Sequence, residues 1–399
     1  MNRAGLIAYD LADFERALTY QQMRAASLRQ RQATRGVAHA LGECADACLA
    51  LDRNEDAYAL YEEVATLDRQ IGDRTDEVNA THNMGICLAR LGETGRAVEQ
   101  LRAAESLAAS IDYRTGRLQT LVSLAGITPD VQESLVSYAR AEALAEELGD
   151  ERIGAHARAQ RTAILPADGV PGAYESGANS YREALQKAQG GEHAAALDLL
   201  EEALRAVALC PGANRELYAV LINRGLNAIG IDEALAAASF SDAAAQAAVR
   251  GDQLDRATAE FQLAKVLGGA LGHTQAAVTV LRRLHERHRA DDSLPPCPLE
   301  ALVALVEGEV LMPGYADDGF VIEHLREALD SARLQDNPAA EVRLLYQWSL
   351  LHERHDRHTD ALEALHRASF LAERHAPSLI EDVRTRLDRL GELSDDGDR

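Results

Sequence analysis

Histidines gather near the end of the chain in a spacing that can bind a metal ion. His352, His355 and His358 follow one another at intervals of three, which places neighbouring side chains on one side of a helix. A zinc protease motif instead requires HExxH, with histidines four residues apart. Arg354 and Arg357 lie within the same segment and would repel a cation. We therefore expect no metal here and interpret the segment as a polar helix end.

Cysteine is the second residue type whose spacing raises the question of chemistry. Cys44 and Cys48 lie one helical turn apart, but no second pair or flanking histidine completes a tetrahedral zinc site. We interpret them as small core residues. The sequence also lacks a phosphate-binding loop, a GxSxG nucleophile motif and a dinucleotide-binding glycine motif. We expect a protein that is not an enzyme and has no cofactor.

Composition points to helices that fold in water. Alanine and leucine dominate, and aromatic residues make up only 4% of the 399 residues, which disfavours a sheet protein. The formal charge of −23 argues against direct nucleic-acid binding and favours a basic partner, if the partner is charged. We find no signal peptide and no membrane span, and an odd number of cysteines, five, which is typical of reduced thiols. The expected location is cytoplasmic. Because only two of the 41 basic residues are lysine, we expect a bacterial source.

A repeat of about 40 residues runs through the sequence. Each repeat is aligned on one small residue, which we call its anchor, and the first three anchors are the alanines at 17, 57 and 97. A large residue follows the anchor by four positions in all repeats but the first. Alanine recurs seven positions after most anchors, so the three columns share one helix face. Glycine marks the turn within a repeat, and pairs such as Gly72-Asp73 and Gly149-Asp150 mark its end. The later anchors are Ser134, Ala196, Ala236, Ala277, Val321 and Ala361.

These columns resemble the tetratricopeptide repeat (TPR), best in HNMGICLARLGETGRAVEQLRAAESL. The resemblance implies an all-α solenoid in which antiparallel helix pairs stack into a right-handed superhelix with a concave groove. A period near 40, rather than about 34, is similar to the longer repeats in the sensor regions of bacterial transcriptional activators.

One long step between anchors, from 134 to 196, predicts an interruption. The segment ERIGAHARAQRTAIL is expected to form an extra helix, and the glycine- and proline-rich PADGVPGAYESGAN follows it. We therefore predict an N-terminal stack at 1–165, a linker at 166–173 and a C-terminal stack with a capping helix at 174–392. The acidic end, 393–399, is expected to be disordered.

Polar residues at two positions of the first helix of a repeat are expected to face the groove. In peptide-binding members of the family, asparagines at matching positions hydrogen-bond the ligand backbone. An ordinary solvated helix face remains the alternative. The predicted groove residues are Asn79, His82 and Asn83, then Asn223 and Asn227, one residue out of register, and finally Arg343, Tyr346 and Gln347.

The predicted fold and groove suggest two alternative functions. The first is a non-enzymatic scaffold whose groove binds a protein or peptide partner. The alternative is a regulatory sensor that changes conformation on binding a signalling peptide or a small ligand and acts through a partner. The sequence leaves the partner and the oligomeric state open.

Overall fold

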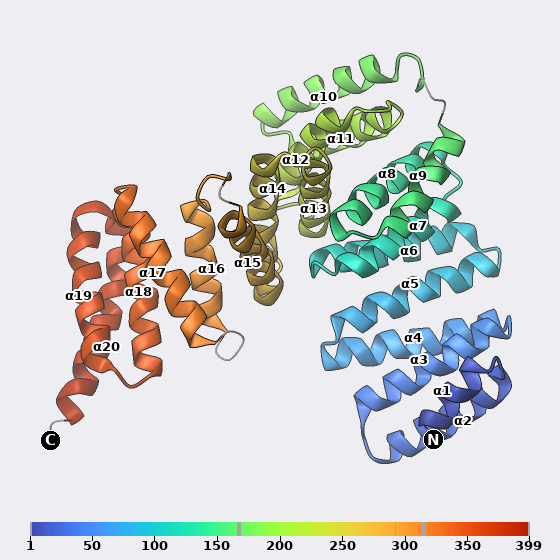
Figure 1. Cartoon of the computed structure of the whole chain (residues 1–399), viewed down its shortest axis with the longest axis horizontal. Coiled ribbons are helices and arrows are strands. Elements are labelled where there is room, and N and C mark those ends of the chain that lie inside the picture. Colours follow the sequence, from blue (N-terminus) through green and yellow to red (C-terminus); the bar gives the residue numbers. More distant parts are fainter. Residues whose placement is uncertain (1, 166–168, 292, 313–316, 398–399) are drawn as a thin grey trace. The chain divides into compact units, whose positions relative to one another are not determined.

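The computed structural model (Figure 1) describes residues 2–165, 169–291, 293–312 and 317–397. Every regular element in these ranges is helical. The chain divides into two compact units, residues 1–259 and 260–399, with the boundary inside one helix, α14 (Gln253–Lys265). The expected all-α fold is therefore confirmed.

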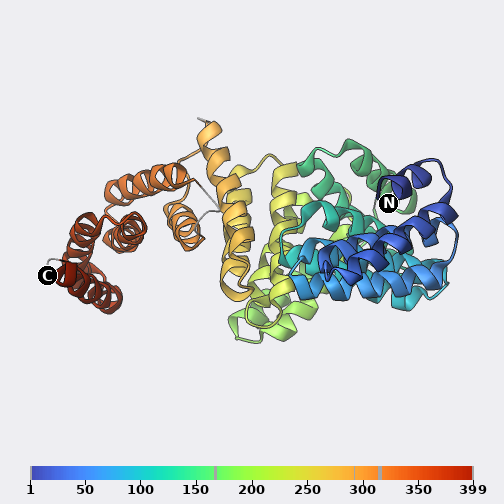
Figure 2. The same ribbon diagram turned by 90° about the horizontal axis from the view of Figure 1, so that it is seen from below.

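Unit 1 consists of paired helices and one additional helix. The two helices of each pair lie side by side, as the two views show (Figure 1 and Figure 2). The pairs are α1 (Asn2–Asp10) with α2 (Phe14–Gln30), α3 (Thr34–Ala50) with α4 (Asn54–Ile71), α5 (Arg74–Arg90) with α6 (Thr94–Ser110), α7 (Arg114–Ile127) with α8 (Val131–Leu148), α10 (Ala173–Gln189) with α11 (His193–Ala208), and α12 (Asn214–Ala228) with α13 (Glu233–Val249). The additional helix is α9 (Glu151–Ile164), which confirms the predicted extra helix.

Unit 2 continues the same pattern. The end of α14 passes into a π-helical turn, η1 (Val266–Ala270), that packs on the next helix. A short 3₁₀ turn, η2 (Pro377–Leu379), precedes the last helix. The helices are α15 (Thr274–Ala290), α16 (Leu299–Leu311), α17 (Asp318–Leu334), α18 (Pro338–Arg354), α19 (His358–His375) and α20 (Ile380–Gly397).

The predicted repeat columns form the core of both units. All nine anchor residues lie on the second helix of a pair and are at most 5% exposed. In the third repeat, Ala97, Leu101 and Ala104 are fully buried, and Gly85 of the preceding helix leaves room for Leu101. A Cβ at Gly85 would lie 2.7 Å from Leu101 Cγ. Large and small residues therefore interlock between helices, as the column spacing predicted.

Glycine and aspartate end the helices where the sequence indicated. Gly72 closes α4 with φ +73°, a left-handed conformation that suits glycine. The side chain of Asp73 then accepts a hydrogen bond from the backbone N–H of Asp76 and caps α5. Gly149 and Asp150 repeat this arrangement between α8 and α9.

Helices that are far apart in the sequence pack together in unit 1, unlike in a stack where each helix contacts only its neighbours. In unit 1, α13 packs against α6 and α8 as well as against its neighbour α12. Small side chains cover this helix on all sides, and twelve of its residues are buried. A helix without a polar face must be enclosed by other elements, and α13 meets that requirement.

Four charged side chains cross this contact and form an enclosed network. Arg117 and Arg140, from α7 and α8, both bind Glu105 of α6 and Asp242 of α13, at N–O distances of 2.6–2.8 Å. The side chains of Arg117 and Asp242 are 1% and 2% exposed. The network therefore links the third and fourth helix pairs to the sixth inside unit 1.

The domain boundaries of the structure differ from the sequence prediction. Helices on both sides of the predicted linker, α8 and α11, pack together within unit 1, and the division lies at 259/260. Residues 166–168 of the linker lie outside the described residues. The last helix, α20, extends through Gly397, into the tail that we expected to be disordered.

Candidate binding groove

Three of the predicted groove residues line one pocket in unit 2. Arg343, Tyr346 and Gln347 lie on α18, the first helix of its pair. Together with Glu307 of α16 and the first turn of α20, they enclose a pocket of about 430 Å³. The helices that contribute, α16, α18 and α20, alternate with the second helices of the pairs, as expected for one face of a solenoid.

Arg343 is fixed by carboxylates on α16. Its Nε and Nη2 atoms donate to the two carboxylate oxygens of Glu307 at 2.8 and 2.6 Å, and Nη1 lies 3.2 Å from Glu300 Oε2. The hydrogen bond with Glu307 is the main reason that the pKa of Arg343 is raised, against the opposing effect of burial. Arg343 thus shapes one wall of the pocket, and its charge is already neutralised.

Gln347 supplies the unsatisfied group of the pocket. Its side-chain Oε1 atom is buried and accepts no hydrogen bond from any described residue. A buried acceptor without a donor costs about 1–3 kcal/mol. Val342, Leu379 and Val383 give the pocket an apolar lining next to this oxygen. The arrangement suits a ligand that carries an N–H donor and an aliphatic group.

A second set of predicted residues lies on α5 in unit 1. Asn79 and Asn83 are both half-buried. Asn79 donates a long hydrogen bond of 3.4 Å to Asp76, and the Asn83 amide makes no hydrogen bond to another described residue. An amide that is accessible and free can both donate to and accept from a peptide backbone.

His82, between these asparagines, is held by the next pair. Its Nδ1 atom lies 3.1 Å from Thr120 Oγ1 on α7. Because the Thr120 hydroxyl donates to the Gly116 carbonyl at 2.8 Å, it must accept from His82. His82 therefore carries its proton on Nδ1, and Nε2 is an acceptor.

Acid should remove the stabilisation that neutral His82 provides. Burial lowers the pKa of His82 below its ordinary value of 6.5, so the native state binds fewer protons than the unfolded chain as the pH falls through that value. We expect the stabilisation to be complete above about pH 6.5 and to be lost below it. His82→Gln retains a donor for Thr120 but does not titrate. The difference in unfolding free energy between wild type and this variant should shrink from about pH 7.5 to about pH 5.5 in urea titrations. A constant difference would contradict the assignment.

The asparagines of α12 have a different role. Asn223 donates to Tyr181 Oη and to the Ala219 carbonyl, both at 2.9 Å. Asn227 is 6% exposed, donates to the Asn223 carbonyl at 2.8 Å and lies 2.9 Å from His193 Nδ1. Both amides tie α12 to α10 and α11. We therefore assign them a structural role in place of the predicted groove role.

The histidines and cysteines do not form a metal centre in the described part of the chain, where no group of three or more metal-binding side chains is found. His355 Nε2 instead lies 2.8 Å from Asp318 Oδ2, and the His352 ring contacts the Trp348 ring in a tilted arrangement. Cys44 and Cys48 are at most 1% exposed, which confirms their interpretation as core residues. Burial raises the pKa of the Cys44 thiol to about 12.

Comparisons with known proteins find likeness at the level of solved structures. No family model and no curated protein sequence matches the chain. The TPR domain of P58(IPK) is 14% identical over 90% of this chain and 99% of that one, with a TM-score of 0.24. Yeast Tom70 is 11% identical (98% and 95%, TM-score 0.28), and a human IFIT1 dimer with m7Gppp-AAAA is 14% identical (98% and 89%, TM-score 0.28). Likenesses this distant do not bear on function.

None of the helices in the described part of the chain combines the length and the apolar character needed to cross a bilayer.

Proposed function

We propose that this chain is a non-enzymatic binding protein that holds an extended segment of a partner protein against the first helices of its pairs. The pocket between α16, α18 and α20 is the anchor point. The observation that carries the proposal is the buried Gln347 Oε1, which has no donor among the residues that the structure describes. A backbone N–H of the bound segment supplies that donor, and this recognition does not depend on the partner's sequence.

Two further features define the partner. An aliphatic side chain of the segment packs on Val342, Leu379 and Val383. Asp382 lies at the same pocket, and the carboxylates of Glu307 and Glu300 already exceed the single charge of Arg343. The net charge of −23 on the chain also favours a positively charged partner. We therefore propose an aliphatic segment flanked by basic residues.

The test is a displayed library of random peptides of about twelve residues, selected on the full chain. Gln347→Leu removes the acceptor and retains side-chain volume. Bound peptides should lose at least about tenfold in affinity, as expected for the loss of one buried hydrogen bond. The melting temperature should not fall, because the variant also removes an unsatisfied buried atom.

A matched control separates the pocket from a general effect of the substitution. Gln275→Leu makes the same change at an exposed position of α15, which does not line the pocket. We expect this variant to bind the selected peptides as wild type does. Equal affinity of Gln347→Leu and wild type for every selected peptide would overturn the proposal.

A further inference from the structure

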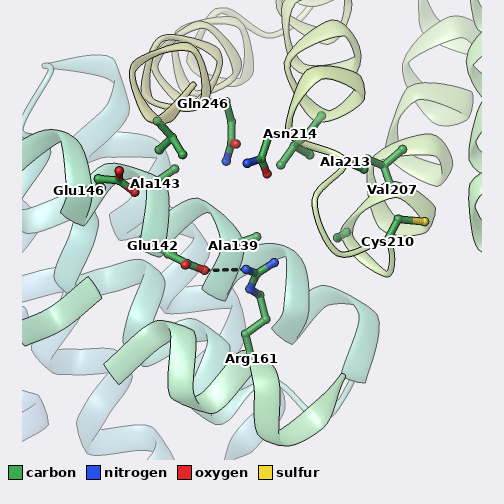
Figure 3. A pocket seen from close by; sticks show the side chains of 13 residues that line it. Ala139, Glu142, Ala143, Glu146, Arg161, Val207, Cys210, Ala213, Asn214 and Gln246 are labelled. Atoms are coloured by element: carbon green, nitrogen blue, oxygen red, sulfur yellow. Dashed lines mark ion pairs between the residues drawn. The ribbon is translucent and has the colours of Figure 1, made fainter. Parts of the chain in front are cut away.

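A small polar pocket lies inside unit 1, lined by none of the groove residues. It is about 60 Å³ in volume and is enclosed by α8, α9, α11, the start of α12 and α13 (Figure 3). About 10–15 Å³ of such volume holds one water molecule, so the pocket accommodates a ligand of about five non-hydrogen atoms.

An enclosed amide without a partner marks this pocket as a binding site. Gln246 of α13 is only 4% exposed, and its side chain makes no hydrogen bond to another described residue. Asn214, at the start of α12, likewise has a free amide. Figure 3 shows both amides reaching into the pocket. Both amides can therefore donate to and accept from a molecule that occupies the pocket.

The opposite wall carries an arginine with one unused donor and, at the rim, an acidic side chain without a described partner. Arg161 of α9 uses Nη2 to bind Glu142 at 2.8 Å, whereas its Nε is buried without a hydrogen-bond partner. Glu142 also binds Arg158 at 2.6 Å and is therefore occupied. The side chain of Glu146, one turn further along α8, makes no hydrogen bond or ion pair to a described residue. The pocket thus offers a donor-only nitrogen and an acceptor-only carboxylate.

We propose that this pocket binds a small zwitterionic amino acid of the size of glycine or alanine. The ammonium group is held by Glu146, and the carboxylate by Arg161 Nε. The amides of Gln246 and Asn214 complete the hydrogen bonds of both ends. The volume of about 60 Å³ beside Ala139, Ala143 and Ala208 leaves room for a hydrogen or methyl side chain only. This inference is independent of the proposed groove.

Four small molecules of similar size distinguish binding of a zwitterion from binding of a single charged group. Glycine and alanine carry both charges, methylammonium carries only the cation, and acetate carries only the anion. In calorimetric titrations of the full chain, glycine or alanine should bind at least about tenfold more tightly than methylammonium or acetate. Equal binding of all four, tighter binding of methylammonium or acetate, or no measurable binding of any would overturn the proposal and leave water as the occupant.

Two substitutions test the residues that carry the site. Gln246→Met removes the amide at similar volume, and Glu146→Gln removes the charge of an exposed side chain at the rim of the pocket. Each should weaken glycine binding by at least about tenfold while circular dichroism stays unchanged. Glu151→Gln, an exposed position on α9 outside the pocket, is the matched control and should leave binding unchanged. If Gln246→Met does not fold, Glu146→Gln decides, and unaltered glycine binding by that variant contradicts the site.

Discussion

Asp242→Ala should lower the free energy of unfolding by about 3–5 kcal/mol, the cost of leaving a buried charge without its partner. Arg117 Nη2 lies 2.8 Å from one oxygen of Asp242, and Arg140 Nε lies 2.6 Å from the other. Removing this carboxylate leaves two enclosed arginines that share the single carboxylate of Glu105. Urea unfolding of the full chain, followed by circular dichroism, measures the loss.

The charge balance around Glu105 explains why the effect is large. Burial alone raises the pKa of Glu105, but Arg140 and Arg117 outweigh it and hold the pKa at about 2. Glu105 is therefore ionised at neutral pH and is held in that form by the two arginines. With Asp242 absent, two positive charges remain against one negative charge inside a contact that excludes water.

A surface ion pair in the same helices is the matched control. Arg102 of α6 binds Glu133 of α8 with two hydrogen bonds of 2.6 and 2.7 Å from Nη2, but the arginine side chain is 54% exposed. Exposed pairs contribute about 0–1 kcal/mol. We expect Glu133→Ala to cost less than about 1 kcal/mol. A similar loss for Glu133→Ala and Asp242→Ala would contradict the role assigned to burial.

Much of the fold was predictable because the repeat is local. Anchor, large and small residues at offsets of four and seven share a helix face, and Ala97, Leu101 and Ala104 are buried as that spacing requires. Turn chemistry is local too, so Gly72 and Asp73 identified the end of one helix and the start of the next. Contacts across many residues leave no such periodic signal. The pairing of Arg117 with Asp242 could not be found, although the absence of a polar face on α13 indicated that other elements enclose it.

The groove residues show the same limit. Arg343, Tyr346 and Gln347 were assigned from the repeat register and do line one pocket, but the contribution of α20 depends on how the chain folds back after α19. Asn223 and Asn227 were assigned one residue out of register. A shift of one residue turns a side chain by about 100° around the helix axis. That rotation directs these amides into α10 and α11, where they are bonded internally.

Phe240→Ala should destabilise the chain by about 3–5 kcal/mol, because it removes a buried aromatic ring from the sixth helix pair and leaves a cavity. Phe240 is 0% exposed and packs over Gly225 of α12. A Cβ at Gly225 would lie 2.6 Å from the Phe240 ring, so Gly225→Ala is itself expected to cost about 1–3 kcal/mol through overpacking.

The two substitutions should not be additive. Once Phe240 is alanine, the new methyl group at position 225 has space, and alanine favours a helix over glycine by about 1 kcal/mol. Gly225→Ala should then stabilise the Phe240→Ala variant, giving a coupling of about 0.5–3 kcal/mol in a double-mutant cycle. Unfolding free energies of the wild type, both single variants and the double variant provide the measurement. If Gly225→Ala costs the same free energy in both backgrounds, Gly225 is not required to make room for the Phe240 ring. The interlocking of large and small residues between α12 and α13 would then be contradicted.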